Sequence, residues 1–325
     1  MPVLEIKNLT KDYGFGRGVF DVDFNVDAGE CYGFLGPNGA GKTTTIRHIM
    51  GFSKPQKGET LVNGKDSWSN YHQIQKTLGY LPGEIALPEN LTGNQFIKMM
   101  ADLRGMSDMS YTQTLIKQFE LEPKGSLKRM SLGMKRKLAI VTAFMHDPDI
   151  LVLDEPTSGL DPVMQDIFIQ FIKAEKERGK TILLSSHIFS EVDATCDKIS
   201  IIKDGRLVSS FVAADLKHSE NKTFKIEFGN NQEFERFCAD AKALGFISTM
   251  DDAATFKIAS IKAHRNQANI RVCDTSINQF LEILSNYQLK FFSEIKFTLE
   301  DYFMNFYDRK KSVDDAKEVF AHAAN

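Results

Sequence analysis

The alternation of hydrophobic and polar positions divides the first 215 residues into short strands and longer helices. Residues 4–10 and 19–26 alternate apolar with polar side chains, which is typical of half-buried strands. Residues 150–153 (ILVL) and 182–184 (ILL) are continuously apolar, which indicates parallel strands covered on both faces. A further strand at 31–35 leads into a glycine-rich loop and a helix. This mixture of elements predicts an α/β domain.

Helices and a hairpin complete this first domain. Residues 94–121 have helical patterns, and residues 161–179 predict a helix with Pro162 near its start and Gly179 just past its end. Residues 198–210 predict a β-hairpin that turns at Asp204-Gly205.

The pattern changes after a polar linker near residue 215. The segments that follow approximate the order βαββαβ, with one additional short strand, which predicts a small ferredoxin-like α+β domain over residues 216–307. A charged tail spans 308–325. The predicted elements are strands at 221–229, 246–252, 254–260, 267–274 and 289–297, with helices at 232–245 and 275–287.

Composition narrows the class of protein. A chain of 325 residues fits two domains, and its net charge of −3 is not that of a general nucleic-acid binder. No apolar run approaches the roughly 18–20 residues of a membrane-spanning helix, and the first residues resemble no signal peptide. The four cysteines are widely separated and have no metal-binding spacing. We expect a cytoplasmic chain that reaches a membrane only through a partner.

Residues 36–43, GPNGAGKT, match the phosphate-binding pattern G-x-x-x-x-G-K-[ST] after a strand and before a helix. The glycines let backbone N–H groups point at phosphate oxygens, Lys42 reaches the β- and γ-phosphates, and Thr43 offers a hydroxyl to Mg²⁺. A glycine-rich turn without a ligand is the weaker alternative. The predicted nucleotide-binding residues of this loop are Gly36, Pro37, Asn38, Gly39, Ala40, Gly41, Lys42, Thr43 and Thr44.

Two acids end the apolar strand at 150–153. Asp154 is placed to hold Mg²⁺ beside the phosphate loop, and Glu155 to polarise an attacking water. Acids at the end of a strand are often only solvated. Because a phosphate-binding loop is present in the same domain, we interpret Asp154 and Glu155 as site residues.

Together these motifs resemble the nucleotide-binding subunits of ABC transporters. The resemblance rests on GPNGAGKT, ILVLDEP, SGLD at 158–161 and His187 in SSH, and it covers residues 1–215. It implies a P-loop NTPase fold with a helical subdomain at about 86–145. The second domain resembles, more weakly, the C-terminal extension of ATPases from ABC-2-type exporters.

The resemblance also implies individual roles. Tyr13 occupies the place of an aromatic that stacks on adenine, although a packing residue at a strand end is the alternative. Glu155 resembles the catalytic base, and His187 the switch histidine that contacts the γ-phosphate. Asp161 resembles an aspartate that crosses the dimer interface, and it can also cap the helix that begins at Pro162.

The segment MSLGM at 130–134 stands where the family carries LSGGQ. The resemblance implies that Ser131 and Gly133 contact the γ-phosphate bound by a second protomer, with Lys135 and Arg136 adding positive charge near it. Leu132 and Met134 depart from the family pattern.

A second departure lies at Gly83, where the family has a glutamine that touches Mg²⁺. Gly83 has no side chain for this contact. We expect the adjacent Glu84 to supply the missing oxygen.

The predicted activity is ATP hydrolysis with Mg²⁺ in the ATP-binding subunit of an ABC transporter, most consistent with an exporter. One phosphate loop and one signature per chain imply a second ATPase protomer, and the resemblance implies a separate transmembrane permease. No nucleic-acid partner is expected. The alternatives are a soluble ABC ATPase with a non-transport role and a binding module without catalysis. The methionines and phenylalanine of the helical segment fit core packing and permease contact equally: Phe96, Met99, Met100, Met106 and Met109.

Overall fold

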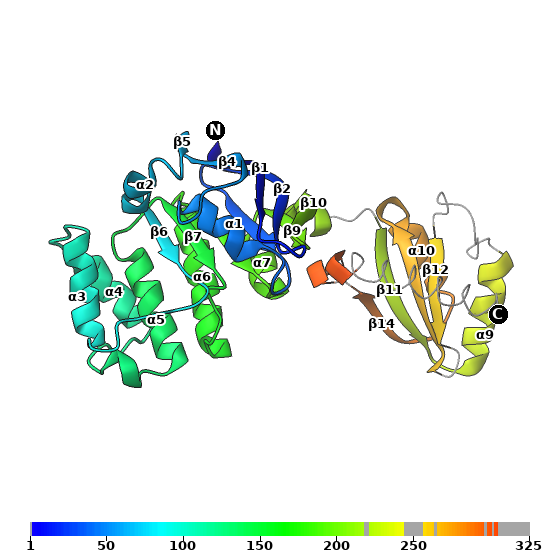
Figure 1. Cartoon of the computed structure of the whole chain (residues 1–325). Coiled ribbons are helices and arrows are strands. Elements are labelled where there is room, and N and C mark those ends of the chain that lie inside the picture. The colour runs from blue at the N-terminus through cyan, green and yellow to red at the C-terminus, as the bar shows by residue number, and fades with distance from the viewer. Residues whose placement is uncertain are drawn as a thin grey trace, which may run out of the picture. The chain divides into compact units, whose positions relative to one another are not determined.

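The computed structural model describes residues 2–217, 221–243, 256–262, 265–295, 298–300 and 302–304 (Figure 1). The chain divides into two compact units, Met1–Ala213 and Ala214–Asn325. The strand predicted at 246–252 and the tail predicted at 308–325 lie outside the described residues. Within the part that the structure describes, no helix is both long and apolar enough to cross a membrane.

A six-stranded sheet forms the centre of the first unit. Its strand order is β10-β9-β3-β8-β7-β6, and all neighbours are parallel except β9 and β10. Every residue of β3, β7 and β8 is buried, which the continuous apolar runs at 150–153 and 182–184 predict for β7 and β8. The strands are β3 (Cys31–Leu35), β6 (Leu78–Leu81), β7 (Ile150–Asp154), β8 (Thr181–Ser186), β9 (Lys198–Lys203) and β10 (Arg206–Val212).

A second, antiparallel sheet of the first unit has the order β2-β1-β4-β5. Its inner face packs with residues of β3 and of the first helix into one hydrophobic core that includes Leu4, Val22 and Ile46. The alternating segments 4–10 and 19–26 form two of its strands, as predicted. The strands are β1 (Pro2–Asp12), β2 (Gly18–Asp27), β4 (Lys57–Val62) and β5 (Lys65–Asp66).

Helices connect and cover these sheets. Helix α1 begins at Lys42 directly after the phosphate loop, and α3, α4 and α5 lie together at one side of the unit (Figure 1). These three helices fall within the segment 86–145. The helices are α1 (Lys42–Ile49), α2 (Tyr71–Thr77), α3 (Gly93–Leu103), α4 (Ser110–Gln118), α5 (Leu132–Phe144), α6 (Pro162–Glu177), α7 (Phe189–Thr195) and α8 (Ala213–Lys217), with a 3₁₀ turn at Leu127–Arg129.

The local signals of the sequence set several boundaries. Asp161 caps α6 by accepting a hydrogen bond from the Met164 N–H (3.0 Å), and Pro162 is its first residue. The hairpin of β9 and β10 turns at Asp204-Gly205, where both residues have positive φ, as a tight two-residue turn requires.

The second unit has the predicted βαββαβ order. Its antiparallel sheet has the strand order β12-β13-β11-β14, which is a ferredoxin-like arrangement. Phe224, Ile226, Phe237, Ile270 and Phe280 form the centre of a separate hydrophobic core. The elements are β11 (Asn221–Phe228), α9 (Asn231–Ala243), β12 (Phe256–Lys262), β13 (Gln267–Cys273), α10 (Ile277–Leu284) and β14 (Leu289–Ile295), with a 3₁₀ turn at Asp274–Ser276.

Candidate functional site

The phosphate loop connects the end of β3 to the start of α1, as the motif requires. Gly41, directly before the helix, has φ +112°, and a Cβ there would lie 2.8 Å from Val19. A Cβ at Gly36 would lie 2.5 Å from the Ile202 carbonyl oxygen. Only glycine meets both requirements, so the loop keeps its compact path with its backbone available for phosphate.

Lys42 lies inside this loop rather than extending into solvent. Its ammonium donates hydrogen bonds to the carbonyl oxygens of Gly36 (2.6 Å) and Pro37 (3.2 Å). The same nitrogen lies 3.0 Å from Oε1 of Glu155, and the Lys42 side chain is only 5% exposed. The cation is therefore held at the centre of the loop, next to a carboxylate.

Asp154 is the last residue of β7 and lies next to the first turn of α1. Its two carboxylate oxygens accept hydrogen bonds from the hydroxyls of Thr43 (2.7 Å) and Ser185 (2.8 Å). Burial raises the pKa of Asp154, whereas these two hydrogen bonds oppose that rise. A carboxylate and a hydroxyl at this spacing form a donor set that fits Mg²⁺.

Glu155 lies between the phosphate loop and His187. Its Oε2 is 2.5 Å from Nδ1 of His187, and its backbone N–H donates to the Ser185 carbonyl oxygen (2.8 Å). The residue has φ +49°, which is uncommon for a residue other than glycine. This turn of the backbone directs the carboxylate away from the strand toward Lys42 and His187.

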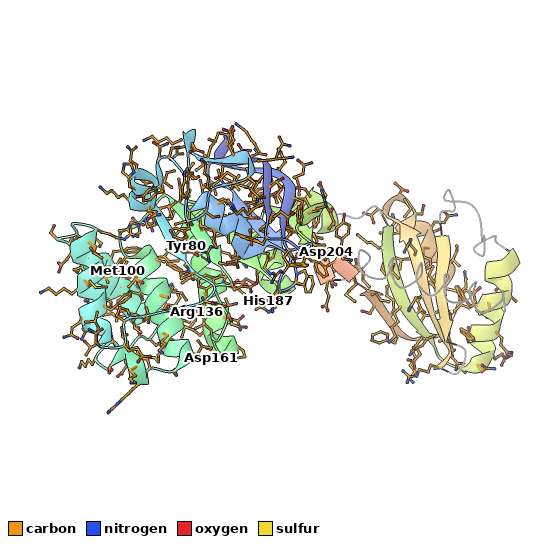
Figure 2. All side chains as sticks on the ribbon, in the orientation of Figure 1. Tyr80, Met100, Arg136, Asp161, His187 and Asp204 are labelled. Atoms are coloured by element: carbon orange, nitrogen blue, oxygen red, sulfur yellow. The ribbon has the colours of Figure 1, made fainter. Side chains whose placement is uncertain are left out.

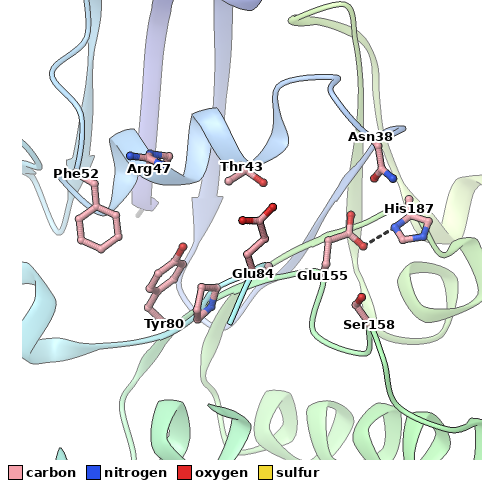
Figure 3. Close-up of a pocket in the computed structure, with 11 residues that line it drawn as sticks. Asn38, Thr43, Arg47, Phe52, Tyr80, Glu84, Glu155, Ser158 and His187 are labelled. Carbon is pink, nitrogen blue, oxygen red and sulfur yellow. Dashed lines mark hydrogen bonds and ion pairs between the residues drawn. The ribbon is translucent and has the colours of Figure 1, made fainter. Parts of the chain in front are cut away.

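Glu155 and His187 line a pocket of about 600 Å³ together with residues of the phosphate loop and of the segment after β6 (Figure 3). Asn38, Thr43, Glu84, Glu155 and His187, all predicted from the sequence, contribute to its lining. Arg47, Phe52 and Tyr80 extend the pocket beyond Thr43 (Figure 3), and no motif in the sequence indicated them.

Gly83 and Glu84 lie on the same pocket, after β6. A Cβ at Gly83 would lie 3.2 Å from Oδ2 of Asp154, so the backbone at this position packs directly against the buried carboxylate. The Glu84 side chain is exposed and points toward Thr43 (Figure 3). A carboxylate at position 84 can therefore approach the Thr43–Asp154 pair from the open side.

Other predicted residues lie outside that pocket. Tyr13 follows β1, is 50% exposed, and has the Lys11 ammonium 5.8 Å from the centre of its ring. An exposed ring near the phosphate-loop domain's antiparallel sheet is available for stacking on a base.

The signature segment forms the N-terminus of α5. Ser131 caps the helix by accepting a hydrogen bond from the Met134 N–H (3.2 Å), and Ser131 and Leu132 are exposed. A Cβ at Gly133 would lie 3.1 Å from the Gly159 carbonyl oxygen. The first turn of α5 therefore packs closely on the loop that leads to Asp161.

The expectation that Arg136 adds positive charge near a phosphate on another molecule is wrong. Its side chain is only 2% exposed, and its guanidinium donates to three carbonyl oxygens of this chain. Leu138, Val141 and Met145 are buried as their helical spacing predicts. Lys135 remains partly exposed beside them.

Glu191 is a buried acid that the sequence analysis missed. It lies in the first turn of α7, is 1% exposed, and accepts a hydrogen bond from the Ser186 hydroxyl (2.6 Å). Burial raises the pKa of Glu191 to about 7, and the nearby charge of Glu155 adds to the rise. Its position four residues after His187 was the only feature of the sequence that could have indicated a place near the site.

Comparisons with known proteins show the family of this chain. The family described as ABC transporter matches residues 19–158. The bacitracin transport ATP-binding protein BcrA of Bacillus licheniformis is 34% identical over 71% of this chain and 76% of its own length. The uncharacterized ABC transporter ATP-binding protein YcbN of Bacillus subtilis is 29% identical over 93% of this chain and 96% of its own length. A solved ATP binding subunit of an ABC transporter is 32% identical, with a TM-score of 0.61 over 66% of this chain and 92% of that chain.

The phosphate loop, its buried lysine and the acidic pair at the end of β7 define a P-loop ATPase domain. The chain belongs to the ABC transporter family, as an ATP-binding subunit whose enzymatic activity is ATP hydrolysis. The family and fold predicted from the sequence are thereby confirmed.

Proposed function

We propose that this chain is the ATP-hydrolysing subunit of an exporter, with Glu155 as the base that activates water. The observation that carries the proposal is the contact of one carboxylate with both Lys42 (3.0 Å) and His187 (2.5 Å). Glu155 and His187 both line the pocket beside the phosphate loop. Glu155 is thus next to the cation that binds the γ-phosphate and next to a second group that can orient the attacking water.

Thr43 and Asp154 would hold Mg²⁺, with Glu84 as a further oxygen donor. When bound, the metal ion would neutralise charge on the β- and γ-phosphates. The hydrogen bonds from Thr43 and Ser185 support the assignment, because they hold the Asp154 carboxylate at the mouth of the phosphate loop.

ATP binding would join two protomers. The exposed first turn of α5, with Ser131 and Gly133, would cover the γ-phosphate on the second protomer, and Asp161 would lie at the interface. The exposure of Ser131 and of Leu132 (61%) supports this role, since a second protomer could cover these side chains. Tyr13 would stack on adenine.

The helical segment would contact a separate transmembrane permease at the inner face of the membrane. On α3, a shallow hollow of about 400 Å³ is lined by Gln95, Lys98, Met99, Asp102 and Leu103, and Leu103 is 74% exposed. Such an apolar surface with methionine suits a protein partner. Relatives named for bacitracin transport and Nod factor export support the export direction. The comparisons give no support to a non-transport role.

We also propose the domain boundaries predicted from the sequence. They are an ATPase core at residues 1–215 with its helical subdomain at about 86–145, an accessory domain at 216–307 and a charged tail at 308–325.

Purification of the tagged chain from detergent-solubilised membranes tests the proposal. We expect a membrane protein with several spanning helices to co-purify, and Leu103→Arg to weaken that association without changing ATP binding. A chain that fractionates without any membrane protein and binds ribosomes or DNA instead would contradict it.

A further inference from the structure

Arg136 is a buried cation in the second turn of α5, inside the first unit (Figure 2). Its guanidinium donates from Nη1 to the Pro82 carbonyl oxygen (2.9 Å), from Nη2 to the Gly83 carbonyl oxygen (2.6 Å) and from Nε to the Ser158 carbonyl oxygen (2.9 Å). One side chain therefore joins α5 to two loops that are far apart in the sequence.

The charge of Arg136 has no salt-bridge partner among the described residues. Burial lowers the pKa of the guanidinium, and the more distant charges of Asp154, Glu155 and Glu191 oppose that change. Burying a cation on carbonyl groups is costly compared with burying an apolar side chain of similar volume. Packing alone therefore gives a poor reason for an arginine at this position.

The two loops held by Arg136 flank the acidic pair of the ATP site. On one side, the backbone of Gly83 packs against the Asp154 carboxylate, with 3.2 Å between Oδ2 and a Cβ built at Gly83. On the other side, the Ser158 N–H donates to the Glu155 carbonyl oxygen (3.1 Å). The guanidinium thus fixes the distance between the segment beside Asp154 and the turn that presents Glu155.

Gly83 makes this anchor more important. A glycine has no side chain to fix its loop and has more backbone freedom than any other residue. Two of the three hydrogen bonds of Arg136 go to the Pro82–Gly83 segment. They restrain the backbone at Gly83, which lacks the fixed φ of the preceding Pro82.

We propose that Arg136 is a positioning residue for ATP hydrolysis. It sets the orientation of the Glu155 turn and of the Gly83 loop relative to the N-terminus of α5, and it does not touch the nucleotide. The proposal rests on the proposed role of Glu155 as the catalytic base. The hydrogen bonds of Arg136 go to Pro82, Gly83 and Ser158, and those of Lys42 go to Gly36 and Pro37. Loss of the guanidinium therefore lowers the rate of hydrolysis and leaves ATP affinity unchanged.

The test compares Arg136→Lys, Arg136→Gln and Arg136→Ala with Lys137→Met in the full chain. Lys137 is the next residue on α5, is partly exposed, and makes no hydrogen bond or ion pair with the described part of the chain. We expect kcat to fall about tenfold or more in the Arg136 variants, with the ATP dissociation constant within about twofold of wild type. Lys137→Met keeps both values.

Chemical rescue separates positioning from simple stability. Ethylguanidinium replaces the atoms removed in Arg136→Ala, so millimolar concentrations should restore part of kcat, whereas ethylammonium should not. If the alanine variant fails to fold, Arg136→Lys provides the test instead, because lysine keeps the charge but cannot make all three hydrogen bonds. Unchanged kcat in Arg136→Gln, or a parallel loss of ATP affinity and kcat in Arg136→Lys, would overturn the proposal.

Glu155→Gln is measured beside these variants. If Glu155→Gln hydrolyses ATP at the wild-type rate, the assignment of the base fails. If Glu155→Gln is inactive while Arg136→Gln is fully active, the base stands and the positioning role of Arg136 fails alone.

Discussion

The ammonium of Lys42 and the carboxylate of Glu155 form an ion pair of 3.0 Å across the phosphate loop. The other carboxylate oxygen of Glu155 contacts His187. The proposed base is therefore already aligned between the group that binds the γ-phosphate and the group that can orient water. A bound phosphate would compete with Glu155 for the Lys42 cation, because both are anions at the same nitrogen.

Glu155→Gln removes the negative charge and the base but keeps the shape of the side chain. We expect kcat to fall about a hundredfold or more, and ATP to bind at least as tightly because Lys42 loses a competing anion. Single-turnover hydrolysis and equilibrium binding of ATP measure the two effects. Glu177→Gln, at an exposed position on α6, is the control and should change neither. Wild-type turnover in Glu155→Gln would reject the base.

Glu84→Ala tests the replacement for the missing glutamine at Gly83. The exposed Glu84 carboxylate points toward Thr43 (Figure 3), so we expect its loss to raise the Mg²⁺ concentration needed for half-maximal hydrolysis about three- to tenfold. Glu89→Ala, at an exposed position on the same segment, is the control. A Glu84→Ala variant with the wild-type Mg²⁺ response would remove Glu84 from the metal site.

The raised pKa of Glu191 predicts a pH-dependent stability. The folded carboxyl titrates near pH 7 and the unfolded one near 4.5, so between these values the folded chain binds more protons. The free energy of unfolding therefore falls as pH rises through this window, by about 3 kcal/mol at most for this group, and levels off above it.

Glu191→Gln cannot titrate and should remove this fall. The free energy of unfolding of the variant relative to wild type is thus expected to increase from pH 5 to pH 8. Urea unfolding at both pH values measures the difference, since all other groups titrate in both proteins. Parallel curves for the two proteins would show that Glu191 is not buried as described.

Local chemistry explains which parts of the fold the sequence predicts. The continuously apolar strand β7 and the glycines around Lys42 each carry their own signal, because burial on both faces or a tight phosphate loop constrains every residue in the segment. The βαββαβ order of the second unit follows from the same periodicity. The sequence did not predict β4 and β5, since their residues include charges and, in β4, a glycine, with few apolar positions. It did not predict β6 either, because a strand of four residues is too short to show a periodic pattern.

Arg136 and Glu191 show what periodicity cannot predict. A charged residue near a helix N-terminus is usually solvated, so the sequence placed Arg136 on the surface. Its burial depends on carbonyl groups 53 and 54 residues away in the chain, at Gly83 and Pro82. Partners at such separation are created by the fold, and no local pattern encodes them.

The central claim is that two chains enclose ATP, with Ser131 of each facing the phosphate held by the other. The most direct test is the mass of the Glu155→Gln variant at saturating ATP, measured by sedimentation equilibrium. We predict a dimer for Glu155→Gln and for its double variant with Leu103→Arg, which adds a charge at an exposed position on α3. The double variant with Ser131→Arg should bind ATP equally well but remain a monomer. A monomeric Glu155→Gln at saturating ATP, or full dimerisation of the Ser131→Arg double variant, would contradict the account.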